Sequence, residues 1–352
     1  MTVNVSKPAI NVREKLAELE KPSGVAGEAM LRAETPQEQF NLINAGRKNF
    51  IINGDMQVAQ RGTSFTNPNA TYTLDRFQAR AGTSGALTVT QEDMPLGQTD
   101  IPGIKNFMRL DQTTARTGAY SFLWQKVEDI KNFDNATLTF SFYAKCDVEK
   151  EFEIVLYNLH GSGGSSDTVI DTVYFYPNDD WQRFEFEIEM PSLSGQTIGS
   201  GSSVLIEFRD ESLGTWTLDI TGMQLERGRV ATPFEHRSYG EELDLCQRYY
   251  YKIADMASGD RVGSGFTATS ANGQCLVTYP QTMRVNPTGS YSGAAGWSFT
   301  TSGGTYTASA ISITANKHSA LVSLTISGAT AGQGGQLRAT SSTSTLAFDA
   351  EL

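Results

Sequence analysis

Aromatic and polar side chains alternate along several segments in a pattern that suits a carbohydrate site. Sugars present apolar ring faces and many hydroxyl groups, so their sites combine flat aromatic rings with neighbouring hydrogen-bonding side chains. Tyr143 and Tyr157 fall on the opposite face from the apolar residues of their predicted strands, and Trp124 is a third candidate ring. Arg183 and Glu185 supply hydrogen bonds. We therefore predict a carbohydrate-binding site at Trp124, Tyr143, Tyr157 and Arg183; the alternative is that the rings cover a second sandwich layer or a subunit interface.

Few residues in the sequence have the types and spacing that catalysis requires. His160, His236 and His318 lie in unrelated segments without the spacing of metal ligands. The glycine-rich stretch 160–166 lacks the lysine and the following helical pattern of a phosphate-binding loop. Glycoside cleavage needs two carboxyls across a cleft, whereas the glutamates of 185–189 alternate with apolar residues as on an exposed strand face. We predict that the protein is not an enzyme, and polysaccharide cleavage is the less favoured alternative.

Metal and disulfide chemistry are also weakly represented. The Asn53–Asp55 turn offers oxygen ligands for calcium, but three oxygens in one turn are a weak signal. The three cysteines are widely spaced, and Cys146 and Cys246 fit small packing positions. We predict no cofactor and no metal site.

The charge and composition of the chain limit the kinds of partner that it can bind. The chain has 352 residues and a formal net charge of −11, which disfavours a nucleic-acid partner. No apolar run reaches the length of a membrane helix, and the polar start at residues 1–6 does not have the pattern of a signal peptide. We therefore expect synthesis in a reducing cytosol without membrane insertion.

The elements that must position the candidate site are mostly strands. Residues 48–236 contain many short alternating segments separated by glycine-rich turns, which predicts an antiparallel jelly-roll sandwich. The segment 137–145 places Leu138, Phe140 and Phe142 on one face and Tyr143 on the other. The segment 181–190 places its phenylalanines inward and Arg183 outward.

The segments on either side of this sandwich differ from it. Residues 1–47 carry short amphipathic helix patterns that cannot bury much surface alone, so their apolar stripes need a partner. We predict a docking segment; a helical cap on the next domain is the alternative. Its predicted contact residues are Val12, Leu16, Leu19, Phe40 and Ile43.

The remaining segments join and complete the chain. Residues 237–253 begin with a capping box at Ser238 and Glu241 and predict a short connecting helix that fixes the angle between the two halves. Residues 254–352 are poor in charge and rich in Gly, Ser and Thr, which predicts a second, smaller β-sandwich with faces suited to subunit packing.

Several stretches resemble structural proteins of tailed bacteriophages. Residues 49–64 resemble the start, and residues 220–235 the last strand, of the carbohydrate-binding-module-like jelly roll in phage tail-fibre and virion proteins. Residues 242–250 and 348–352 resemble the segments that follow in such proteins, and residues 6–19 and 34–43 are similar to the leader of marine phage structural proteins.

The resemblance implies a role on a virus particle. It implies a homotrimeric fibre or fibre-like protein, assembled in the host cytoplasm, that joins other virion proteins through residues 1–47 and contacts host surface glycan. It implies no catalytic residues. An adaptor or decoration protein that binds only other virion proteins is the alternative.

Overall fold

A computed structural model describes residues 47–118, 121–211 and 213–352. These residues are mainly β-strand, as the sequence predicted, and form several antiparallel sheets. The predicted docking residues Val12, Leu16, Leu19, Phe40 and Ile43 lie outside the described residues. None of the helices in the described ranges is long and apolar enough to cross a membrane.

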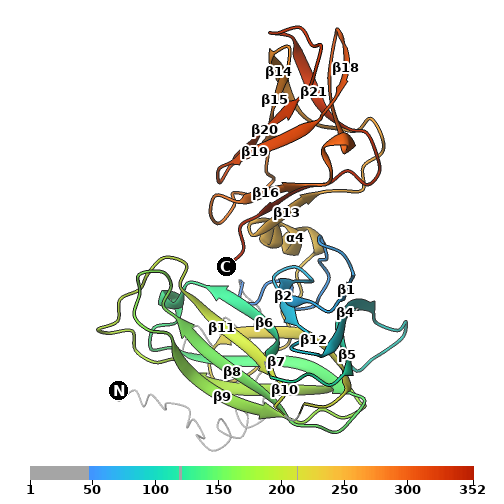
Figure 1. The fold of residues 1–352 in the computed structure, drawn as a ribbon. Coiled ribbons are helices and arrows are strands. Elements are labelled where there is room, and N and C mark those ends of the chain that lie inside the picture. Colours follow the sequence, from blue (N-terminus) through green and yellow to red (C-terminus); the bar gives the residue numbers. More distant parts are fainter. Residues whose placement is uncertain (1–46, 119–120, 212) are drawn as a thin grey trace, which may run out of the picture.

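The first half is a jelly-roll-like sandwich of two six-stranded antiparallel sheets (Figure 1). Sheet A contains, in spatial order, β1 (Ser64–Thr66), β4 (Ala86–Asp93), β5 (Asn106–Thr114), β12 (Trp216–Arg227), β7 (Thr137–Cys146) and β10 (Gln182–Glu189). Sheet B contains β2 (Asn69–Tyr72), β3 (Gln78–Arg80), β6 (Ser121–Glu128), β11 (Ser203–Arg209), β8 (Phe152–Leu159) and β9 (Thr168–Phe175). A single 3₁₀ turn, η1 (Ile130–Phe133), follows β6.

The core of the sandwich follows the alternation of the strand sequences. In sheet A, Phe142 pairs with Phe184 and Phe140 with Phe186, so their rings share the inner face. Phe142 contacts Phe208 of sheet B with ring centroids 5.6 Å apart. The same pairing turns the intervening residues of β7 and β10 away from the core, which confirms the predicted outward orientation of Tyr143.

The connecting helix is shorter than predicted. Helix α4 (Tyr239–Gln247) starts with the expected capping box between Ser238 and Glu241. The prediction that the helix extends to residue 253 is wrong, because Tyr250–Ile253 forms strand β13 and pairs with β22 (Leu346–Asp349). Aromatic and β-branched residues suit a strand, and the pairing partner lies about a hundred positions along the chain, beyond the reach of a local pattern.

The second half is a smaller sandwich-like unit. Sheet C contains β13, β22 and β16 (Thr288–Tyr291). Sheet D contains β18 (Gly304–Thr307), β17 (Trp297–Thr301), β21 (Gly334–Ala339), β14 (Arg261–Thr269), β15 (Asn272–Thr278), β20 (Ser319–Thr325) and β19 (Ala310–Ala315). A short 3₁₀ turn, η2 (Ala294–Gly296), precedes β17. The buried Trp297, Phe299 and Phe348 belong to one core shared by both sheets.

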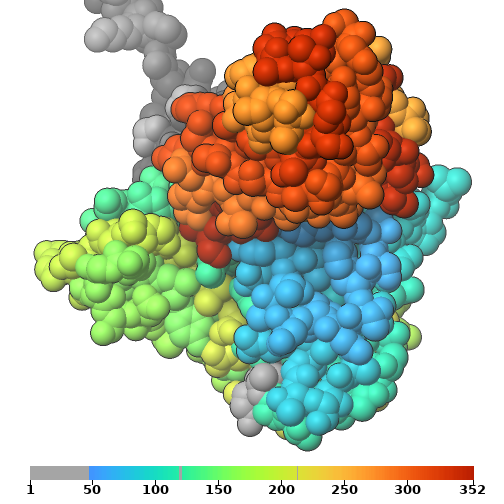
Figure 2. Space-filling view, turned by 45° about the horizontal axis from the view of Figure 1, so that its top comes forward, coloured from blue at the N-terminus to red at the C-terminus, as the bar shows by residue number. Residues whose placement is uncertain are grey.

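The two halves meet at a polar junction beside α4 (Figures 1 and 2). Glu351, which follows β22, is buried and forms ion pairs with Arg76 and Arg61 of the jelly roll. Arg248 pairs with Glu128 at 3.0 Å, and the Tyr249 hydroxyl donates to the same carboxylate at 2.8 Å. Figure 2 shows the orange and red C-terminal half resting on the blue residues at the start of the jelly roll. These contacts support the expected fixed orientation of the halves.

Candidate functional site

The structure separates the four predicted carbohydrate residues onto two opposite faces of the jelly roll. Tyr143 of β7 and Arg183 of β10 are directly paired on the outer face of sheet A. Trp124 and Tyr157 lie on the outer face of sheet B, on β6 and β8, with β11 between them. The four residues therefore cannot form one site.

On sheet B, the candidate side chains are held by their own neighbours. Arg209 donates to the Tyr157 hydroxyl and lies 5.7 Å from its ring centroid, while Glu207 accepts from Arg209 at 2.8 Å. Burial raises the pKa of Tyr157. Trp124 is only 9% exposed, and its indole N–H donates to Gln78. Trp124 therefore presents little ring surface to a ligand.

On sheet A, Tyr143 and Arg183 lie under two covering segments. Tyr143 packs against a small apolar cluster that includes Ile104 and Phe234, from the loop after β4 and the segment after β12. Arg183 donates to the Thr232 carbonyl at 2.6 Å. Gly222 permits this close packing, because its φ is +62° and a Cβ there would lie 2.9 Å from both Ile104 and Tyr143.

Trp181 is the ring that sequence reasoning did not select. It precedes β10, after a turn in which the Asp180 N–H donates to the Asn178 side chain at 3.0 Å. Trp181 is half-buried and meets Phe107 edge to face with ring centroids 5.5 Å apart. Its position two residues before the outward Arg183 is the signal that could have identified it.

Three charged side chains lie beside these rings in one row across β7, β12 and β5. Lys145 pairs with Asp219, and Asp219 pairs with Arg109 in the strand register. Arg109 donates to both Asp219 oxygens at 2.8 Å, and Lys145 lies 3.6 Å from the same carboxylate. The hydrogen bond with Asp219 raises the pKa of Arg109. Asp219 is buried, whereas the Arg109 and Lys145 side chains are 40% and 32% exposed, so it orients two accessible cations.

We refer to this surface of sheet A as the Trp181 face. It combines the half-buried Trp181 ring with side chains that can donate hydrogen bonds, and Lys145 lies 5.3 Å from the Trp181 ring centroid. An apolar ring surface flanked by oriented donors can pack against one face of a sugar and bind its hydroxyls. Its accessible side chains are Arg109, Lys145 and Trp181, whereas Phe107 is buried beside Trp181 and Tyr143 and Arg183 lie under the covering segments.

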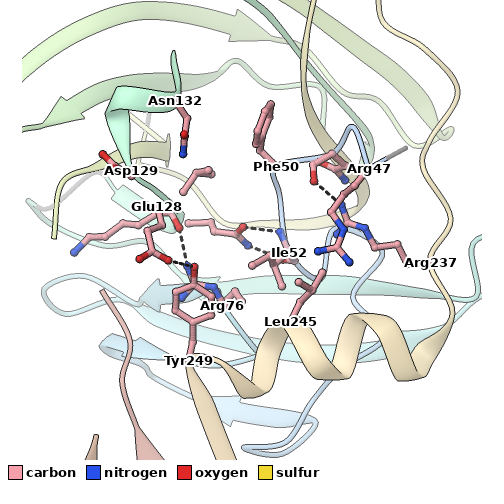
Figure 3. Close-up of a pocket in the computed structure, with 14 residues that line it drawn as sticks. Arg47, Phe50, Ile52, Arg76, Glu128, Asp129, Asn132, Arg237, Leu245 and Tyr249 are labelled. Atoms are coloured by element: carbon pink, nitrogen blue, oxygen red, sulfur yellow. Dashed lines mark hydrogen bonds between the residues drawn. The ribbon is translucent and has the colours of Figure 1, made fainter. Parts of the chain in front are cut away.

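A cavity of about 290 Å³ lies at the junction of the two halves (Figure 3). Arg76 stacks on Tyr249 with its guanidinium carbon 3.5 Å from the ring centroid, and Glu128 accepts from Tyr249. Arg237 pairs with Glu242 of α4 and donates to backbone carbonyls. Because these polar groups are already used between the halves, we assign the cavity walls to the junction rather than to a ligand site.

The described ranges contain no cluster of three or more His, Cys, Asp or Glu residues suited to a metal ion. The Asn53 side chain of the calcium candidate instead binds the backbone of Val58 and Asp75. Burial and the nearby Glu242 raise the pKa of Asp55 to about 6. The Asn53 backbone N–H also donates to Glu242 of α4, so the turn helps to hold the start of the jelly roll against this helix.

Comparison with known protein families and with curated proteins finds no match. Among solved structures, the chain is similar to a putative sugar binding protein from Bacteroides thetaiotaomicron VPI-5482, with 14% identity over 51% of this chain and 100% of that one, and a TM-score of 0.35. It is also similar to the CBM22-1 xylan-binding domain of Paenibacillus barcinonensis Xyn10C, with 15% identity, 47% and 95% coverage and a TM-score of 0.31. A third similarity is to the enzymatically active domain of tailspike protein 4 from bacteriophage CBA120, with 11% identity, 51% and 21% coverage and a TM-score of 0.33.

Proposed function

We propose that this protein binds a glycan across the Trp181 face of its jelly roll. The observation that carries the proposal is the half-buried Trp181 ring set beside Phe107 and the exposed ends of Arg109 and Lys145. Such a surface can bury one face of a sugar ring while the cations donate to its hydroxyls.

We propose binding without bond cleavage. Glycoside hydrolysis requires one carboxylic acid and one carboxylate on opposite sides of the sugar. On the Trp181 face, Asp219 is held by Arg109 and Lys145, and Glu185 pairs with Arg183 at 3.0 Å. These pairings place both carboxylates in ion pairs that orient cations.

We further propose that the protein is a homotrimeric component of a bacteriophage particle, a fibre or fibre-like protein assembled in the host cytoplasm and attached through residues 1–47. The resemblance of its first, middle and last segments to phage structural proteins supports this role. The three cysteines Cys146, Cys246 and Cys275 are buried and free, which fits folding in a reducing compartment.

Binding of host surface polysaccharide to the full chain tests the glycan proposal. Trp181→Ala should weaken binding at least tenfold in calorimetry, because it removes the ring on which the sugar packs. Tyr174→Ala is the matched control, since Tyr174 is an exposed ring (49%) on β9 of the opposite sheet, and it should bind as the parent does. Failure of every host polysaccharide to bind would favour an adaptor or decoration role, and release of reducing ends would favour a depolymerase.

Particles assembled with a chain that lacks residues 1–47 test the attachment. The truncated chain should be missing from purified virions while the full chain is present. Virions that still carry the truncated chain would contradict attachment through this segment.

A further inference from the structure

The outer face of sheet D is a partly apolar surface at the far side of the C-terminal half, with the exposed Arg261 beside Gln336 on it (Figure 1). Leu276 of β15 and Leu321 of β20 are directly paired and are 53% and 38% exposed. Phe266 of β14 pairs with Gln274 of β15, two residues from Leu276, and is 50% exposed. These three side chains form one exposed apolar patch, because neighbouring positions on one sheet face lie within side-chain reach.

The C-terminal half carries no net charge, which favours association of copies through its surface. Residues 254–352 contain four acidic and four basic residues, so the net charge of −11 resides entirely in residues 1–253. Copies of an acidic chain repel one another except where they meet through a neutral part. The acidic residues Asp349 and Glu351 are moreover already engaged by Arg61 at the junction.

The polar residues around the patch can pair with identical residues. The row across sheet D reads Thr300, Gln336, Ser264, Leu276, Leu321 and Thr314. Hydroxyl and amide side chains each carry both a donor and an acceptor, so they can bind copies of themselves without a mismatch. A surface of lysines or glutamates could not do so. Arg261 is the charged residue at this row and already donates to Gln336 at 2.7 Å, so the leucines and the hydroxyl residues are left to meet a second copy of this chain.

The size of the face is also adequate. Seven strands about 4.8 Å apart, each about six residues long at about 3.3 Å per residue, give a face of roughly 600 Å². Two such faces bury roughly 1,200 Å², the lower end of the range for specific interfaces.

We propose that copies of this chain associate through the outer face of sheet D, with Phe266, Leu276 and Leu321 at the contact. The number of copies in this inference rests on the proposed homotrimeric function, whereas the choice of surface does not. It assigns assembly to the C-terminal half and leaves the Trp181 face of the jelly roll free to bind a ligand.

The mass of the full chain in solution, measured by light scattering over a range of concentrations, tests the inference. The parent should be associated, with three times the 38.3 kDa of one chain if the proposed trimer holds and twice that mass if two faces meet directly, and the double variant Leu276→Asp with Leu321→Asp should show one chain mass. Val169→Asp is the matched control, since Val169 is 57% exposed on the edge strand β9 of the jelly roll, and it should stay associated. Circular dichroism of all variants checks that they are folded.

The outcomes separate the inference from the proposed function. A monomeric parent, or a double variant that is folded and still associated, would overturn the inference. A dimeric parent that the double variant dissociates would support the surface and contradict the threefold assembly. Loss of glycan binding in Trp181→Ala with unchanged mass would support the ligand site independently.

Discussion

The junction of the two halves and the Trp181 face contain the same kinds of side chain, but these side chains are buried to different extents. In each, an arginine lies against a carboxylate and near an aromatic ring: Arg76 with Glu351 and Tyr249, and Arg109 with Asp219 and Phe107. The Arg76 side chain is 1% exposed, whereas the Arg109 side chain is 40% exposed.

This difference in burial separates a structural role from a binding role. A buried ion pair has no water to replace a lost partner, so removal of one partner leaves an uncompensated charge. A half-exposed pair keeps water at its outer side and contributes little to stability. Only the half-exposed group can exchange that water for a ligand.

The largest effect should come from Glu351→Ala at the junction. The change leaves Arg76 buried without a carboxylate, and we expect a loss of about 3–5 kcal/mol in the free energy of unfolding. Urea denaturation followed by tryptophan fluorescence measures it.

Asp349→Ala is the matched control for that measurement. Asp349 pairs with Arg61 at 3.2 Å, as Glu351 also does, but its side chain is 45% exposed. Its loss should cost at most about 1 kcal/mol. Equal effects of the two variants would contradict the argument from burial.

A smaller and pH-dependent effect is expected for Asp55→Asn, beside α4. Burial and the nearby Glu242 raise the pKa of Asp55 to about 6 from an ordinary value of 3.8. The folded state therefore binds more protons than the unfolded state between about pH 4 and pH 6, so this carboxyl lowers stability as the pH rises through that window.

The amide removes that penalty while its oxygen can still accept from Gln57. At pH 7 we expect Asp55→Asn to be more stable than the parent by about 2 kcal/mol, and by almost nothing at pH 4. Unfolding free energies at both pH values give the comparison. A difference that is independent of pH would show that the carboxyl does not titrate in this window.

The fold was predictable where the burial pattern is local. The inward Phe140, Phe142, Phe184 and Phe186 follow from alternation along single strands, and the capping box at Ser238 from a four-residue motif. The strand order and the β13–β22 pairing were not predictable, because they depend on partners far along the chain. The ion pair between Glu351 and Arg76 was likewise not predictable, because no local sequence pattern connects the two residues.

The candidate site was predictable only in part. Alternation correctly turned Tyr143 and Tyr157 outward, but it does not say which outward faces coincide, so residues of two opposite sheets were combined. Trp181 begins the predicted segment 181–190 and shares the parity of Arg183, but the sequence prediction did not select it. Its contacts with Phe107 and Lys145, which lie on other strands, identify it as part of the site.

The smallest effect on stability should come from Lys145→Ala on the Trp181 face. The Lys145 side chain is 32% exposed and lies 3.6 Å from Asp219, which keeps both hydrogen bonds from Arg109. We expect the free energy of unfolding to change by less than about 0.5 kcal/mol, because a surface ion pair contributes little. Glycan affinity should fall severalfold in calorimetry, since a donor beside the Trp181 ring is lost. A stability loss as large as that of Glu351→Ala, with unchanged affinity, would instead make the Trp181 face a second structural junction.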